Sequence, residues 1–122
     1  MRIERLSADK RARNLDDIFV GAVDSQRVIG EETRDLRLAE HTFHDGARNK
    51  LHTHTTDQIL IVTAGDGIIA TEHEEREIQT GDVVHIPAGE RHWHGAQPGH
   101  DMTHLAIIGA GKTFIVADDR VL

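Results

Sequence analysis

The sequence predicts an all-β fold, a barrel or sandwich built from short strands. Three observations support this prediction: short apolar, β-branched stretches recur along the chain, glycines mark the turns between them, and no long segment has the apolar period of a helix. Repeated short strands without intervening helices are typical of closed or layered antiparallel sheets. The 122 residues are enough for one domain with a single core.

The N-terminal part of the chain is predicted to be an arm, and the rest a barrel. Residues 1–18 are charged and at most mildly helical, whereas residues 18–23 are apolar enough for a first strand. Because an edge strand favours pairing with another strand, we expect the arm, residues 1–30, to pair across a homodimer. Residues 31–122 then form the barrel.

The barrel strands are predicted in order along the chain. Residues 33–43 alternate charged and apolar side chains, as a half-buried strand does, and residues 58–64 are almost continuously apolar, so both their faces should be covered. Residues 65–67 (Gly-Asp-Gly) are predicted to be a tight turn into residues 68–71, which makes a hairpin, and residues 72–77 to be a charged turn. The remaining predicted strands are residues 50–54, 83–86, 91–96, 102–108 and, more weakly, 112–116.

The composition argues against several classes of partner. The formal net charge is −7, whereas nucleic acids and anionic membranes are bound by clustered lysine and arginine, so we expect neither of these partners. The chain has no cysteine and therefore no disulfide or thiolate site. We expect a cytoplasmic protein, because no apolar signal segment and no run near the ~20 apolar residues of a membrane helix is visible.

Three of the ten histidines, together with one glutamine, have the spacing of a metal site. His52 and His54 are two residues apart, so on a strand both side chains leave from one face, and Gln58 keeps the same parity. His92 arrives from a second strand. Three imidazoles and one amide oxygen meeting inside a barrel would bind a divalent transition metal and leave positions open for a small-molecule substrate. Because the imidazoles must be neutral, metal affinity should fall below pH ~6.5.

The residues around these ligands carry a family resemblance. Two spaced motifs resemble the two characteristic motifs of the cupins: Gly46-x5-His52-x-His54-x3-Gln58-x6-Gly65 and Gly81-x5-Pro87-x-Gly89-x2-His92. The resemblance implies a double-stranded β-helix, or jelly-roll, barrel with a metal at its centre. One departure is Gln58, where cupins usually have glutamate. Losing that charge should make the metal a stronger Lewis acid that favours an anionic ligand, or alternatively weaken its binding.

Within the cupins, the chain is similar to small bacterial members that act as manganese-dependent hydroxynitrile lyases. The similarity is carried by residues 58–65, 92–96 and 102–107. It implies manganese as the metal, although iron, nickel, cobalt or zinc tolerate the same donor atoms. The predicted function is a metal-dependent lyase acting on a small oxygen-bearing organic molecule. The alternatives are a metal-dependent dioxygenase and a non-catalytic metabolite-binding cupin.

Three further histidines are candidates for proton transfer. His94 shares the parity of His92, so it either moves a proton or orients the His92 ring. By resemblance, His104 lines the same pocket. His41 is a third candidate if it faces inward and a surface residue if it faces outward. The other histidines are predicted to be surface or structural residues, namely His44, His73, His85 and His100. Trp93, of opposite parity to His92, is predicted to pack in the core.

Overall fold

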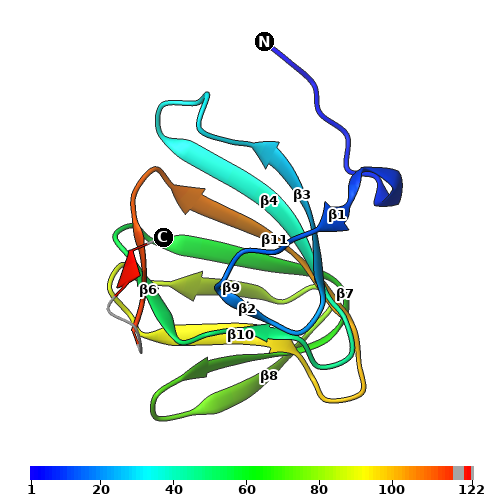
Figure 1. Cartoon of the computed structure of the whole chain (residues 1–122), viewed down its shortest axis with the longest axis vertical. Coiled ribbons are helices and arrows are strands. Elements are labelled where there is room, and N and C mark those ends of the chain that lie inside the picture. Colours follow the sequence, from blue (N-terminus) through cyan, green and yellow to red (C-terminus); the bar gives the residue numbers. More distant parts are fainter. Residues whose placement is uncertain (117–119, 122) are drawn as a thin grey trace.

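The computed structural model describes residues 1–116 and 120–121, so the end of the predicted barrel at residue 122 lies outside the described residues. It confirms the predicted all-β fold: antiparallel strands curl around a common interior (Figure 1). The described part of the chain has a single 3-10 turn, Ala8–Lys10, and no α-helix. The strands are β1 (Ala12–Arg13), β2 (Phe19–Val20), β3 (Val23–Ile29), β4 (Leu36–Phe43), β5 (Arg48–Asn49), β6 (His52–His54), β7 (Gln58–Thr71), β8 (Glu75–Gln79), β9 (Val83–Ile86), β10 (His92–Ala96), β11 (Met102–Gly109), β12 (Thr113–Ile115) and β13 (Arg120–Val121). None of the described helical residues forms a segment long and apolar enough to cross a membrane.

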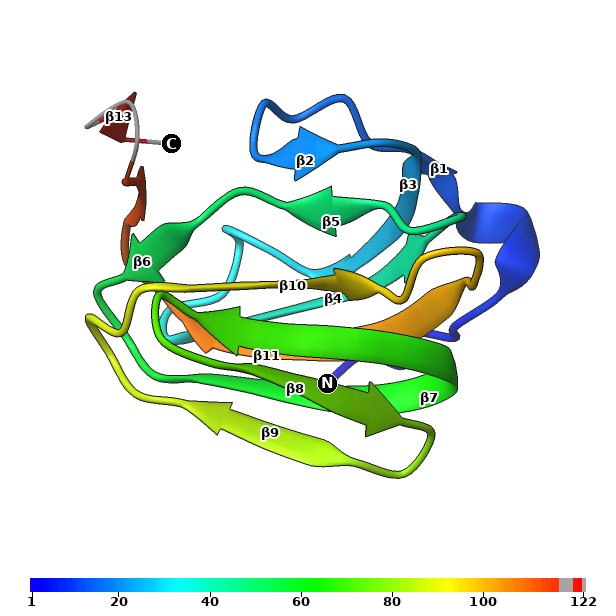
Figure 2. The same ribbon diagram turned by 90° about the horizontal axis from the view of Figure 1, so that it is seen from below.

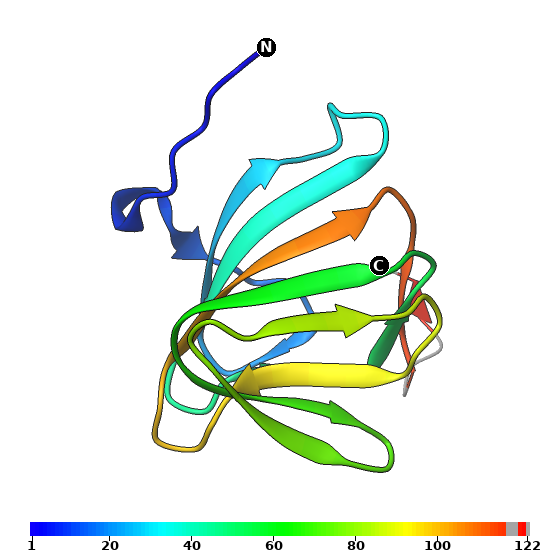
Figure 3. The same ribbon diagram turned by 180° about the vertical axis from the view of Figure 1, so that it is seen from behind.

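Two sheets share strand β7. The first sheet has the order β1-β3-β4-β11-β7-β9 and uses the first half of β7. The second sheet pairs the other half of β7 with β8 and β10, and continues from β10 through β6 to β12 and β13, with β5 and β2 beside them. Figures 2 and 3 show the strands of both sheets curling round the same interior.

The predicted hairpin at residues 65–67 is wrong, because β7 continues through it as one bent strand of 14 residues. Gly65 still pairs with Met102 in the first sheet, and Gly67 already pairs with Ala96 in the second. Gly65 has φ +79°, a backbone conformation that glycine adopts without steric cost and that bends the strand sharply. The glycines that suggest a turn at this point instead bend β7, so that its first half belongs to one sheet and its second half to the other (Figure 2).

The predicted charged turn at residues 72–77 is also partly wrong, because its second half begins strand β8. This strand is polar apart from Ile78, which is buried against the core. It pairs on one side with the second half of β7. A single inward-facing apolar residue is enough to seat such an exposed edge strand, and the surrounding charges protect it from pairing with other chains.

Alanine at Gly65 is expected to destabilise the fold more than alanine at Gly81. A Cβ on Gly65 would overlap the carbonyl oxygen of Asp101, whereas a Cβ on Gly81 would meet no atom within 4 Å. Both residues have positive φ, so Gly81→Ala should cost the backbone strain alone, about 1 to 2 kcal/mol. Gly65→Ala adds the steric overlap and should cost roughly 3 kcal/mol or more. Denaturant unfolding of both variants measures the difference, and equal losses would contradict this account of the bend.

The N-terminal arm lies against its own barrel. The predicted strand 18–23 is interrupted at Gly21, which has φ +89°, into β2 and the start of β3. Strand β2 pairs with β5, and β3 pairs with β4, within the same chain. The backbone N–H of Ser7 donates to Gln26, and Arg11 forms an ion pair with the buried Glu40 at 2.8 Å. Pairing of the arm across a homodimer stays a prediction.

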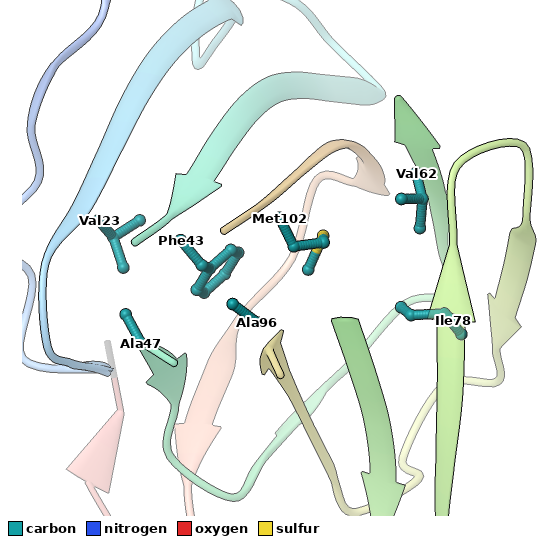
Figure 4. Packing of buried hydrophobic residues seen from close by; sticks show 7 residues of the cluster. All are labelled: Val23, Phe43, Ala47, Val62, Ile78, Ala96 and Met102. Carbon is teal, nitrogen blue, oxygen red and sulfur yellow. The ribbon is translucent and has the colours of Figure 1, made fainter. Parts of the chain in front are cut away.

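An apolar core fills one end of the barrel (Figure 4). It contains Val23, Phe43, Ala47, Val62, Ile78, Ala96 and Met102. Phe43 pairs with Met102 across β4 and β11, and two residues further along the same strands His41 pairs with His104. The core therefore lies directly beneath a layer of histidines. Trp93 instead lies half-buried outside this core, with the Arg48 guanidinium 4.9 Å from its ring centroid.

Candidate metal centre

The structure brings together the three imidazoles that the sequence places in the metal site. His52 on β6 lies directly opposite His92 on β10, and His54 follows on the same face of β6. Their ligand atoms all lie within 4.8 Å of one another. His52 and His92 are each only 1% exposed. The period of two along β6 and the cross-strand register of β6 and β10 thus build a buried three-histidine group.

Backbone carbonyls fix the orientation of two of these rings. The Nδ1–H of His52 donates to the carbonyl oxygen of Lys50 at 2.6 Å, and that of His92 donates to Glu90 at 2.8 Å. A carbonyl can only accept, so the proton of each neutral ring is on Nδ1. The lone pair is then on Nε2, and an oriented imidazole of this kind is the usual arrangement of a metal-binding histidine.

Several buried polar atoms of the site have no hydrogen-bond partner among the described residues. These are Nε2 of His54, Nε2 of His92 and Oε1 of Gln58. Nδ1 of His54 is held by Thr113 Oγ1 at 2.7 Å, so its Nε2 is the free nitrogen. Leaving such atoms unpaired in the interior costs free energy, and imidazole nitrogens and amide oxygens are donor atoms for divalent transition metals. The residues present therefore fit a metal ion.

Burial keeps the three imidazoles neutral. Together with the neighbouring His92, it lowers the pKa of His52 to about 3 and that of His54 to about 4. Burial also lowers the pKa of His92. The rings are consequently in their metal-binding form well below neutral pH.

Behind these ligands, Asn49 and two histidines form a hydrogen-bonded chain with a fixed direction. The backbone N–H of His94 donates to Asn49 Oδ1 at 2.8 Å, which orients the amide so that Nδ2 donates to His94 Nε2 at 3.1 Å. His94 must then carry its proton on Nδ1 and donate it to His104 Nε2, also at 3.1 Å. The proton of His104 is left on Nδ1, a buried atom without a partner among the described residues.

The hydrogen bonds from Asn49 through His94 to His104 change the interpretation of His94. Both its ring nitrogens are engaged, and it is Glu90, not His94, that orients the His92 ring. The sequence does not single out Asn49. Its contact with His94 depends on the pairing of β5 with β10, in which Arg48 lies opposite Gly95. No local pattern in the sequence reveals that pairing.

His41 faces inward, which resolves the alternative that the sequence leaves open. Its ring lies 5.7 Å from that of His104, and its Nδ1 is 2.6 Å from Ser25 Oγ. Ser25 is held in turn by Asn14 Nδ2 at 3.0 Å. Burial lowers the pKa of His41 to about 4. No hydrogen-bond partner of its Nε2 lies among the described residues.

A cavity of ≈ 850 Å³ opens onto the site. Its inner wall includes five residues of the predicted site, namely His41, His52, His54, Gln58 and His94, but not His92. His104 is fully buried and is not part of the wall, so it meets the cavity only through the rings of His41 and His94. Burial lowers the pKa of His104 to about 3.

The remaining histidines lie at or near the surface, as expected. Three of them lie 2.8 to 3.4 Å from carboxylates: His44 beside Asp24 and Asp101, His85 beside Asp57, and His100 beside Asp66. His73 is exposed in the turn before β8. None of them belongs to the three-histidine group.

Comparison with known proteins finds several relatives. Over 109 residues, which are 88% of this chain and 83% of the relative, the sequence is 42% identical to an (R)-mandelonitrile lyase of Granulicella tundricola. It is 32% identical to an acireductone dioxygenase of Parasynechococcus marenigrum, over 60% of this chain and 44% of that protein.

Solved structures and a family match agree with these relatives. A cupin-like protein from Thermotoga maritima superposes with a TM-score of 0.77 at 33% identity, covering 81% of this chain and 77% of that one. Residues 39–116 match Cupin_2, the cupin domain family. The matched segment contains every residue of the three-histidine group and most of the barrel. The chain therefore belongs to the cupin family.

Proposed function

We propose that this chain is a metal-dependent lyase acting on small oxygen-bearing organic molecules, with a cyanohydrin as the model substrate. The observation that carries the proposal is the set of buried, unpaired donor atoms on His54, His92 and Gln58, of which those on His54 and Gln58 belong to residues that line a cavity. The 42% identity to an (R)-mandelonitrile lyase over most of both chains supports this reaction class.

His52, His54, His92 and Gln58 would hold the ion, and manganese is the first candidate. A bound divalent ion would supply Lewis-acid polarisation of a substrate hydroxyl, which lets a weak base remove its proton. All four side chains are neutral, so they leave the charge of the ion uncompensated. The site should therefore favour ligands that become anionic.

His41 is placed to move the substrate proton. Its Nδ1 is held by Ser25, its ring lines the cavity, and burial keeps it neutral. In cyanohydrin cleavage the hydroxyl proton passes to His41 Nε2, and the bond to the nitrile carbon breaks as the carbonyl forms. Cyanide leaves with the electron pair, and the ring returns the proton to it. The His94–His104 pair packs behind His41 and gives this ring a neutral, fixed environment.

The proposal is tested by mandelonitrile cleavage. Protein loaded with manganese should release benzaldehyde, followed by its absorbance, and metal-stripped protein should not. Activity equal to that of the stripped protein would remove this substrate class. Ligand binding without any turnover would instead support a metabolite-binding cupin.

Replacing His41 by leucine is expected to lower kcat by about 10²- to 10⁴-fold, because the proton then lacks an acceptor in the cavity. KM should change little, since the metal ligands are untouched. His73→Leu, at an exposed turn, is the matched control and should keep full activity. An unchanged kcat in the His41 variant would exclude it as the base and move the role to another group.

A metal-dependent dioxygenase is the second candidate, favoured by the acireductone dioxygenase relative. It predicts oxygen uptake that depends on a redox-active metal such as iron. The same protein loaded with redox-inert zinc should then be inactive, whereas a lyase would retain activity. Measurement of oxygen uptake with each metal separates the two reactions.

A further inference from the structure

Arginines face the cavity from the same sheet surface as the metal-site glutamine. On β11, Ile108 lies opposite Gln58 of β7 on one side and opposite Arg37 of β4 on the other. Directly opposed residues project to the same face of a sheet, and all three side chains line the cavity. Two strand spacings separate the Cα atoms of Gln58 and Arg37, about 10 Å.

The guanidinium of Arg37 is only partly used by the protein. Its Nη1 donates to the carbonyl oxygen and the hydroxyl of Thr33 at 3.0 Å, and to the carbonyl of Leu36 at 3.1 Å. Among the described residues no carboxylate pairs with it, and its Nε and Nη2 have no hydrogen-bond partner. The loop thus fixes the half-buried Arg37 head at the cavity mouth with donors to spare.

Two residues further along these strands, the next row of directly opposed residues on the same face of the sheet has small side chains and a second arginine. Ala106 lies opposite Ala39, and Ala39 lies opposite Arg27 of β3. Two alanines in the middle of the row leave a hollow between the metal site and the arginines. Arg27 forms an ion pair with Asp16 at 2.9 Å, but both side chains are more than half exposed. An exposed pair of this kind contributes little and yields readily to a better ligand.

We propose that the cavity mouth is a carboxylate subsite, in which Arg37, assisted by Arg27, binds the carboxylate of a small organic acid. The hydroxyl or carbonyl end of the same molecule then lies over Ala39 and Ala106 and reaches the metal centre. This inference rests on the proposed function, since it names the substrate class of that site. It makes the chain selective for hydroxy or oxo acids over their uncharged analogues.

The chemistry of the mouth fits this class of ligand. A guanidinium presents paired N–H donors that match the two oxygens of a carboxylate, and such charge-assisted bonds are stronger than neutral ones. The charged residues that line the cavity carry one surplus positive charge, although the whole chain is acidic: Arg27, Arg37 and Lys112 against Asp16 and Glu31. The pKa of His41 is lowered mainly by burial, the charge of Arg27 lowers it as well, and that of Asp16 raises it.

A matched pair of probes tests the subsite. Calorimetry would measure the binding of 3-formylbenzoate and of 3-formylbenzamide, which has a similar shape without the charge. Wild-type protein loaded with manganese should bind the carboxylate about ten- to a hundredfold more tightly than the amide. Arg37→Gln should abolish most of this preference, and Arg27→Gln should reduce it.

Arg34→Gln is the matched control, because Arg34 is on the same loop, is 93% exposed in its side chain and does not line the cavity. It should keep the preference. Because Arg37 also makes hydrogen bonds to the loop, Arg37→Lys serves as a second variant. Lysine retains the positive charge but lacks the paired N–H donors of a guanidinium, so this variant should keep only part of the preference. Thermal unfolding of each variant verifies that it is folded.

The outcomes separate the subsite from the lyase proposal. No preference for the carboxylate in the wild type, or a preference that survives both Arg37→Gln and Arg37→Lys, would overturn the subsite even if mandelonitrile is cleaved. A preference that disappears in Arg37→Gln and persists in Arg34→Gln would support it even if no cyanohydrin is cleaved, because binding is measured without turnover.

Discussion

Replacing His92 with alanine is expected to abolish stoichiometric metal binding and the activity that depends on it. His92 supplies a buried Nε2 without a protein partner, at the junction of β6 and β10 where it faces His52. Removing it leaves two imidazoles and one amide, too few strong donors to hold an ion. Changes to residues that merely support a ligand commonly cost 10- to 100-fold in affinity, so losing the ligand itself should cost at least about a hundredfold.

Elemental analysis of protein purified from manganese-supplemented medium measures this directly. The wild type should carry about one ion per chain, a 1:1 stoichiometry set by the single three-histidine group in the described residues. His100→Ala is the control, because His100 is exposed beside Asp66 and should leave the metal content unchanged. Full metal occupancy in His92→Ala would contradict the site, and equal loss in both variants would indicate a non-specific effect.

Acidification from pH 6.5 towards pH 4 is expected to unfold the metal-free protein. Burial is the largest cause of a lowered pKa in six histidines of the interior, with values of about 4 for His41 and His54 and about 3 for His52 and His104, and lowered values for His92 and His94. In the unfolded chain the same groups titrate near 6.5. Below that pH the unfolded state therefore binds more protons than the folded state, and the free energy of unfolding decreases as the pH is lowered.

The size of this effect follows from the number of groups. Each histidine protonated only in the unfolded state removes up to about 1.4 kcal/mol per pH unit. Several such groups acting together exceed the usual net stability of a small domain within about two pH units. The loss should begin near pH 6.5 and continue until the folded-state pKa values are reached, about 4 for His41 and His54 and about 3 for His52 and His104.

Denaturant unfolding of chelator-treated protein at pH 7, 6 and 5 checks the sign and the slope. Metal-loaded protein should resist acid better, because the ion binds only the neutral, folded site. The burial seen in the structure also moves the expected loss of metal to lower pH than the free-imidazole value suggests. A metal-free protein whose stability stays flat between pH 7 and pH 5 would show that these histidines are not buried as described.

The sequence predicts the barrel and the ligand set because both depend on local spacing. Alternation with a period of two places His52 and His54 on one face of any strand, wherever that strand lies in the fold. The strands 83–86, 91–96 and 102–108 are recovered to within about one residue as β9, β10 and β11, since glycine turns and a proline bound their apolar runs. The errors occur where one local signal has two structural outcomes: Gly65 can turn a chain or bend it, and residues 72–77 can be a loop or a polar edge strand.

The remaining features are decided by register between strands that are distant in the sequence. The pairing of β5 with β10 places Asn49 against His94 and so fixes which nitrogen of His94 carries the proton. The pairing of β4 with β11 turns His41 inward beside His104 and sets Arg37 level with Gln58. Side-chain parity is a property of one strand, and the sequence alone determines it. Neighbourhood across a sheet depends on how strands align, and only the folded protein, through the burial of its core and the completion of its hydrogen-bond ladders, determines that alignment.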